Sequence, residues 1–382
     1  MKQKIQLLRE FSIPLIAGVF VALIWANFGA SSYHDFVEGH FFGPLSFHFV
    51  TNELFMVFFF GIAAVEITQS CLPGGDLNPP RKAINPLLAT LGGAVGPVAV
   101  YLGLNYLIGD PALARGWGIP TATDIALAWL VARMVFGAGH PAVPFLLLLA
   151  VADDAIGLAI IAIFYADPNL PAAPQWLLLI LAGMAASYLL RRMKVTNYWP
   201  YLIVGGGLSW AGLFMAHLHP ALALVFVVPF LPSERAVAAH IFEDDPRDRS
   251  TLTTFEHEWK IFVDFGLFMF GLANAGVMFS GVGTATWLVL ASLMIGKTVG
   301  ITIMGYVGVL LGFPLPEKVG GKELLVIGLV AGLGLTVALF VAGEAFSDPA
   351  TQGAAKMGAL MSGGIALLAL AAGRLFKIEK IN

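Results

Sequence analysis

Two adjacent aspartates lie in the middle of a strongly apolar stretch, and this feature constrains the chain more than any other. Residues 142–166 read AVPFLLLLAVADDAIGLAIIAIFYA, with Asp153 and Asp154 near the centre. The stretch is long enough to cross a bilayer as a helix, which takes about 20 residues. The sequence therefore predicts a transmembrane helix with two carboxyl groups at its middle.

Such a pair is expensive to bury. Each central Asp costs about 2.5–3.5 kcal/mol on insertion scales. Consecutive helical residues point about 100° apart, so the two carboxyl groups can meet different partners in one cavity. Two carboxylates this close do not readily ionise together in an apolar setting. We therefore hypothesise that protons and a metal cation compete for Asp153 and Asp154. The alternative is a structural aspartate pair that is hydrogen-bonded between helices.

The composition is that of a membrane protein with many spans. Of 382 residues, 58% are hydrophobic and 12% are charged, whereas soluble proteins carry about 25% charged residues. The net charge of −3 gives no indication of a nucleic-acid partner, and the single cysteine, Cys71, excludes an intrachain disulfide. The basic N-terminus and the apolar run after it predict a retained first helix rather than a cleaved signal peptide.

Apolar runs bounded by polar, Gly or Pro residues predict an all-α membrane protein with about twelve transmembrane helices in one domain, residues 1–382. The predicted spans are 10–29, 46–70, 84–108, 117–136, 142–166, 174–191, 198–217, 219–232, 255–279, 284–312, 323–346 and 354–376.

The basic residues set the predicted orientation. If the N-terminus is cytoplasmic and the spans alternate, most of the 21 Lys and Arg residues fall on the cytoplasmic side, as the positive-inside rule requires. Both termini are then cytoplasmic. Residues 29–46 form an external loop, as solvated chain, a small hairpin or a contact with a partner subunit. Residues 233–251 form a polar cytoplasmic linker.

Two of the predicted spans are interrupted. The fourth carries Pro120 and the polar run TATD, and the eleventh carries Gly332 and Gly334. Irregular backbone at membrane depth is tolerated only where it faces protein or a water-filled cavity. Each broken span is the middle of three, in 84–166 and in 284–376, and the two trios start on opposite sides. We therefore predict inverted-topology repeats whose broken helices cross at the midplane, where transporters of this kind bind their ions.

Two further charges belong to this crossing. Asp124 follows the break of the fourth span and is placed to neutralise two positive half-helix ends. Lys297 is the only charge in the span 284–312 and is too deep to reach either surface. We predict that it pairs with Asp153 in at least one state and helps to offset the negative half-helix ends. The alternative is a purely structural salt bridge.

At these residues the chain resembles the NhaA-type sodium/proton antiporters. The resemblance runs nearly from end to end. The motifs that carry it are NELFMVFFF with Glu53 and Glu66, GWGIPTATDIALA, VADDAIG, HLHPALA, FEH followed by LANAGV, GKTVGI and GLVAGLGLTVALF.

The resemblance implies electrogenic exchange of protons for Na+ or Li+ across a bacterial inner membrane, with a role in pH homeostasis. It implies no cofactor and a homodimer in the lipid bilayer. It also implies that Asp154 is the principal cation ligand, that Asp153 pairs with Lys297, and that Thr123 is an auxiliary oxygen ligand. Asp124 would compensate charge at the broken helices.

The resemblance further implies a set of residues for the pH response. Glu66, Glu256 and His257 would lie near a cytoplasmic funnel, and His219 would occupy a position associated with pH sensitivity. The chain departs from the family here, because Ile67, Thr68 and Gln69 follow Glu66 where the family usually has basic residues. An extra acid, Asp264, follows the FEH motif.

Other functions remain open on the residues alone. A cation-coupled symporter of an organic solute would need a larger polar cavity. An intramembrane aspartyl protease needs two aspartates that face each other across a water, whereas adjacent ones diverge by about 100°. A channel would lack proton coupling.

Overall fold

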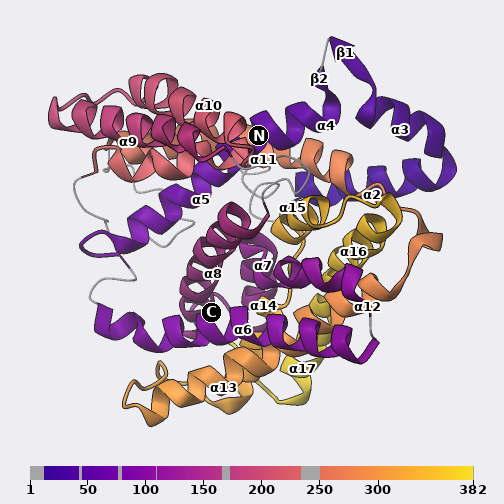
Figure 1. Cartoon of the computed structure of the whole chain (residues 1–382). Helices are drawn as coiled ribbons and strands as arrows, with labels where there is room; N and C mark the ends of the chain where they lie inside the picture. Colours follow the sequence, from indigo (N-terminus) through magenta and orange to yellow (C-terminus); the bar gives the residue numbers. More distant parts are fainter. Residues whose placement is uncertain are drawn as a thin grey trace, which may run out of the picture.

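A computed structural model describes residues 13–42, 45–75, 80–108, 110–165, 173–233 and 250–381 of the chain. This part is almost wholly helical (Figure 1), which confirms the predicted all-α class. Its one sheet is an antiparallel hairpin of β1 (His40–Phe42) and β2 (Leu45–Ser46). The predicted linker at 233–251 lies almost entirely outside the described residues.

The helical elements follow one another with short connections. Those of the first half are α2 (Ile13–Phe28), α3 (Ala30–Glu38), α4 (Phe47–Phe49), η1 (Val50–Phe55), α5 (Met56–Cys71), α6 (Pro80–Ile108), η2 (Pro111–Thr121), α7 (Ile125–Phe136), α8 (Ala142–Phe164), η3 (Pro174–Trp176), α9 (Leu177–Arg192), η4 (Tyr201–Gly206) and α10 (Gly207–Met215). Those of the second half are η5 (Pro220–Phe226), η6 (Val228–Phe230), α11 (Thr251–Asn274), η7 (Phe279–Gly281), α12 (Thr284–Ala291), η8 (Ser292–Gly296), α13 (Lys297–Leu310), α14 (Gly321–Ala331), α15 (Thr336–Ala345), α16 (Pro349–Met361), η9 (Ser362–Gly364) and α17 (Ile365–Leu375).

Six helices among the described residues are long and apolar enough to cross a membrane, and two bent pairs raise that number to eight. Every predicted span overlaps a helical segment. The eighth, 219–232, consists of the short turns η5 and η6. The total of twelve crossings stays a prediction.

The predicted external loop is more ordered than a solvated chain. It contains α3 and the β1–β2 hairpin, which projects from the helical body at the top of Figure 1. The hydroxyl of Tyr33 on α3 donates to the Leu272 carbonyl at 2.7 Å, which ties α3 to the end of α11.

Glycines bring α6 and α13 into close contact. A methyl group on Gly92 would lie 2.1 Å from the Gly300 carbonyl oxygen, and one on Gly96 would lie 2.3 Å from that of Gly296. Small residues four apart let two membrane helices approach at backbone distance. This crossing fixes the start of α13, where Lys297 lies.

We expect Gly92→Leu to destabilise the protein, because a side chain here meets backbone that cannot move aside. Overpacking of this kind costs about 1–3 kcal/mol. The matched control is Gly103→Leu on the same helix, where a Cβ meets nothing within 4 Å. Thermal unfolding in detergent should show a lower Tm for the first variant only. Equal Tm values would show that the crossing tolerates side chains.

The two bent pairs meet at their breaks. The pair η2 and α7 is bent by 59°, and the pair α14 and α15 by 51°. In the first, Pro120 has non-helical backbone angles. The backbone N–H of Asp124 in the first break donates to the Leu333 carbonyl in the second, at 2.6 Å. Each break therefore supplies hydrogen-bond partners that the other lost.

The helix α8 lies against these elements. It packs on α5, α6, α7, α14 and η2, and Figure 1 shows it beside α7 and α14. The order α6, bent pair, α8 is matched by the order α12–α13, bent pair, α16–α17. The inverted symmetry between the two sets stays a prediction.

Candidate functional site

A buried ion pair lies at the centre of α8. The ammonium of Lys297, at the start of α13, contacts Oδ2 of Asp153, and both side chains are 0% exposed. A charge pair without solvent is weak evidence for stability, because desolvation offsets the attraction. Its position therefore calls for a functional explanation.

The local backbone that presents Lys297 is unusual. The π-helical segment η8 directly precedes it, and π-helical turns occur frequently at functional sites. Gly296 and Gly300, on either side of Lys297, lie against α6. The backbone of α13 is thus held close to α6 while the lysine side chain extends toward α8.

Thr123 joins the ion pair to the breaks of the two bent pairs. Its Oγ1 accepts a hydrogen bond from Lys297 Nζ at 2.7 Å. The same hydroxyl lies 2.7 Å from Asp153 Oδ2 and 2.8 Å from the carbonyl oxygen of Ala331, the last residue of α14. One hydroxyl proton serves one acceptor at a time. The Thr123 hydroxyl can therefore donate either to Asp153 in the ion pair or to the Ala331 carbonyl at the end of α14.

The surroundings of Asp154 differ from those of Asp153. Its side chain is partly accessible, and the charges of Asp153, Glu66, Lys297 and Asp124 act on it. Among the described residues, neither Oδ1 of Asp154 nor Oδ1 of Asp153 has a hydrogen-bond partner. An unsatisfied buried acceptor costs about 1–3 kcal/mol, and more when charged. A bound proton or a hard cation would satisfy both oxygens.

No group of three or more His, Cys, Asp and Glu side chains in the described part of the chain could hold a resident metal. The oxygens at this place are two carboxylates, one hydroxyl and the carbonyl at the end of α14. Oxygen ligands of this kind are those that hard cations prefer.

Asp124 lies between the N-termini of two half-helices. Its Oδ1 accepts from the backbone N–H of Leu127 at 3.1 Å, in the first turn of α7. Its Oδ2 accepts from the backbone N–H of Thr336 at 3.4 Å, where α15 begins. A carboxylate at a helix N-terminus is favourable because the first N–H groups lack partners. One side chain here caps both helices.

Three of the predicted pH-response residues lie on α5 and α11. The Gln69 amide donates to Glu256 Oε2 at 2.8 Å, and Lys260 Nζ lies 3.6 Å from Glu256 Oε1. The charges of Lys260, Glu256 and Asp264 act on Glu66. His257 is exposed. Glu66 is electrostatically linked to Asp154 as well, so this group borders the central site.

His219 is not part of that group. It is buried at 8% exposure, its Nε2 contacts the Tyr165 carbonyl at the far end of α8, and its Nδ1 lies 3.7 Å from Glu344 Oε2. The four predicted pH-response residues thus divide between two ends of the molecule.

Sequence reasoning missed two kinds of partner. Lys260 was not assigned to Glu256, although the spacing of four residues is the signal for such a pair on a helix. Glu344 was not assigned at all. Its position near the end of the eleventh span gave no sign that His219, more than a hundred residues earlier, lies beside it.

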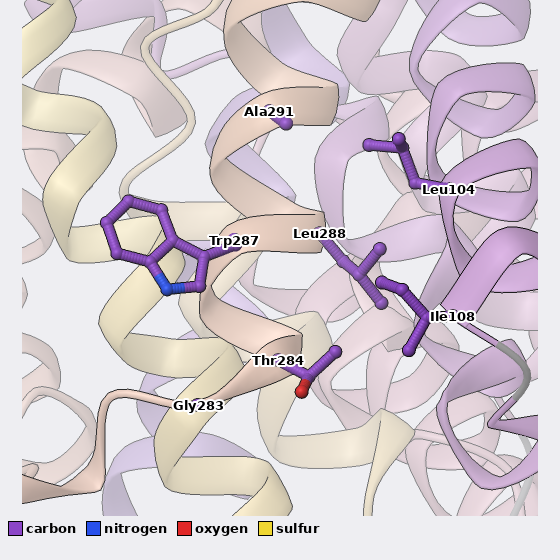
Figure 2. Close-up of a pocket in the computed structure, with 7 residues that line it drawn as sticks. All are labelled: Leu104, Ile108, Gly283, Thr284, Trp287, Leu288 and Ala291. Carbon is purple, nitrogen blue, oxygen red and sulfur yellow. The ribbon is translucent and has the colours of Figure 1, made fainter.

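The groove of Figure 2 is separate from the charged site. It has a volume of about 540 Å³ and lies between the end of α6 and α12. Figure 2 shows Leu288 of α12 pointing toward Leu104 and Ile108 of α6. The lining residues carry no charge, so the groove offers nothing that binds an ion.

Comparison with known proteins agrees with this geometry. The sequence model of the family "Na+/H+ antiporter 1" matches residues 4–373. The chain is 72% identical over 381 residues to the Na+/H+ antiporter NhaA of Geobacter sulfurreducens, with both proteins covered in full. It is 71% identical over 382 residues to Na+/H+ antiporter NhaA 1 of Pelobacter propionicus, again over both full lengths. A relative from a Jannaschia species, also named Na+/H+ antiporter NhaA, is 44% identical, with 97% of each chain covered.

Proposed function

Because the chain belongs to the Na+/H+ antiporter 1 family, we propose that it exchanges cytoplasmic Na+ for external H+ through competition at Asp153 and Asp154. Family membership makes it a multi-pass transporter of the bacterial inner membrane rather than an enzyme. The exchanged ions are its cargo, and the reaction needs no cofactor.

The observation that carries the mechanism is the unequal pairing of the two aspartates. Asp153 is bound to Lys297 and Thr123, whereas Asp154 Oδ1 is buried without a partner. With both acids ionised and Lys297 charged, the three groups sum to one negative charge. One proton or one Na+ neutralises them, and both cannot bind Asp154 together.

Electrogenic exchange requires more than one proton per Na+. Lys297 is the second proton-bearing group at the site. When Na+ takes Oδ2 of Asp153 as a further ligand, the ammonium loses its partner, and an unpaired buried lysine releases its proton. Thr123 then turns its hydroxyl proton to the Ala331 carbonyl and offers a lone pair to the cation.

Access to the site would change at the broken helices. The breaks contact each other through Asp124 and Leu333, and Thr123 connects them to the ion site. Neutralisation of Asp154 therefore affects the broken helices, which have to move when access to the site changes. A protein that changes access only when Asp154 holds either Na+ or a proton performs exchange and not leak.

The predicted orientation is supported by the position of the C-terminal residues. Ile381 exchanges backbone hydrogen bonds with Gly139 and Phe136, at 2.8 and 2.9 Å. The end of the chain therefore lies beside the α7–α8 connection, which the predicted topology also places in the cytoplasm. The inverted repeats of 84–166 and 284–376, the use of Li+ and the homodimer stay predictions.

The test is exchange in proteoliposomes. We expect Na+ to dissipate an imposed pH gradient, with Li+ and K+ compared in the same preparation. The Na+ concentration for half-maximal exchange should fall by about tenfold per pH unit over the range in which one proton competes, because the ligand must be deprotonated to bind. A half-maximal concentration that does not change with pH would contradict competition. A sodium-coupled symporter would leave the pH gradient intact with Na+ alone.

A further inference from the structure

A second group of buried and half-buried titratable residues lies at the other end of α8, away from Glu66. It consists of Glu53 on η1, His219 before η5, Glu344 on α15 and Lys356 on α16. We call these four residues the outer cluster, because the orientation proposed above places them on the external side. Tyr165, which His219 contacts, is eleven residues beyond Asp154, or about 16 Å along the helix.

We infer that the outer cluster is a proton-binding station, from which protons entering from outside pass toward Asp153 and Asp154. The inference rests on the proposed function, since such a station is needed only in a protein that transports protons. It assigns the reaction a new residue, Glu344, and a place on the proton path.

The hydrogen bonding of His219 determines where the proton binds. Its Nε2 lies against the Tyr165 carbonyl, which is an acceptor, so Nε2 carries the hydrogen. The lone pair of the neutral ring is then at Nδ1, which lies 3.7 Å from Glu344 Oε2. An added proton at Nδ1 forms an ion pair with Glu344 at once.

The net charge of the outer cluster can be neutralised by one added proton. The charges of Glu344 and His219 act on Glu53, and that of Glu344 acts on Lys356. Two ionised glutamates and one charged lysine sum to one negative charge, which a single proton on His219 neutralises. Glu53 Oε2 is buried and lacks a partner among the described residues. With both glutamates ionised, the cluster therefore carries an uncompensated negative charge when His219 is neutral.

Three other titratable groups face the cluster. His48 Nε2 lies 2.9 Å from the Asn52 amide nitrogen, whose own oxygen accepts from Asn274. His48 is thus an acceptor there and carries no charge. Glu38 is exposed and acts on Lys356 from outside. Arg115 lies near Tyr165, with its carbonyl 2.7 Å from the Tyr165 hydroxyl.

The backbone around Glu53 supports a functional site here. The segment η1 is π-helical, as is the segment η8 that precedes Lys297. Glu53 and Glu66 lie on one continuous helix, Phe47–Cys71, thirteen residues or about 20 Å apart. Because Asp154 is linked electrostatically to Glu66, protonatable groups are present at both ends and in the middle of the protein.

The test uses two substitutions with opposite charge effects. Right-side-out vesicles are loaded with Na+, and Na+ efflux is measured as outer pH varies at fixed inner pH. Glu344→Gln removes the negative charge beside Nδ1, so the outer-pH midpoint of exchange should move down by about one unit, a tenfold change in proton concentration. Lys356→Met removes a positive charge, so the midpoint should move up. The dependence on inner pH should stay unchanged in both.

Glu317→Gln, the same change at an exposed carboxyl group of the described chain, is the matched control and should match the native protein. Midpoints that stay in place in both variants, or that move in the same direction, would overturn the inference. If Glu344→Gln does not fold, which size-exclusion chromatography will show, the direction of the Lys356→Met shift decides alone.

The two proposals fail in different ways. If the native protein shows no Na+-dependent proton movement, the proposed function fails. If the native protein exchanges, Asp154→Asn does not, and the outer-cluster variants keep the native midpoint, only the outer station is wrong.

Discussion

Asp154→Asn should abolish Na+/H+ exchange and leave the fold intact. The substitution removes a carboxylate whose buried Oδ1 has no hydrogen-bond partner among the described residues. Loss of a charged ligand costs about 3 kcal/mol or more, which corresponds to at least about a 100-fold loss of Na+ affinity. In proteoliposomes the exchange rate should fall to the level of empty vesicles.

The fold should be unaffected because Asp154 Oδ1 has no partner to lose. Thermal unfolding, followed by the fluorescence of the eight tryptophans, should give a Tm equal to or above that of the native protein. The matched change is Asp153→Asn, which breaks the contact with Lys297 and should lower Tm. Sodium-dependent exchange retained by Asp154→Asn would refute the assignment of the ion site.

Lys297→Ala should be the most destabilising single change at the site. Removing one partner of a buried ion pair leaves an uncompensated charge and costs about 3–5 kcal/mol. Thr123 loses a donor at the same time. The Tm in detergent should fall, and exchange should be lost or show an altered dependence on pH.

The double variant Asp153→Asn/Lys297→Met separates stability from function. It removes both charges at once, so much of the lost Tm should return. Together with the native protein and the single variants Asp153→Asn and Lys297→Met, it forms a double-mutant cycle. Exchange should not return to the native rate together with the Tm, because the second proton carrier is gone. Additive losses of stability would mean that the two groups do not interact, and unchanged transport with unchanged pH dependence in Lys297→Ala would exclude a role for the lysine.

The division of the charged groups explains how one site can serve two ions. Lys297 and Thr123 hold Asp153 in place. In the proposed mechanism, Asp154 remains available to bind Na+ or a proton. Asp124 serves two half-helices and so stabilises the irregular backbone at the breaks. Asp154, which we propose to bind the ions, and Asp124, which holds the backbone at the breaks, are thus different residues.

Much of this site could be predicted from the sequence, because a charged residue inside a membrane-spanning stretch indicates a functional or structural role. Asp153, Asp154, Asp124 and Lys297 stand deep within apolar runs of the sequence, where each charge is costly enough to require a reason. Pro120 and the glycines at 332 and 334 indicated the interruptions, because backbone geometry at proline and glycine is local.

The sequence by itself determined that the chain is helical, suited to a membrane, and provided with charges at membrane depth, since these properties depend on composition and on spacing along one helix. Only the tertiary structure decided which charges meet. His219 faces Glu344 rather than the Glu66 group, and Thr123 reaches both Lys297 and the end of α14. Such contacts depend on how helices far apart in the sequence cross. The crossings are set by packing, as at the glycine contact between α6 and α13, and no local sequence pattern encodes them.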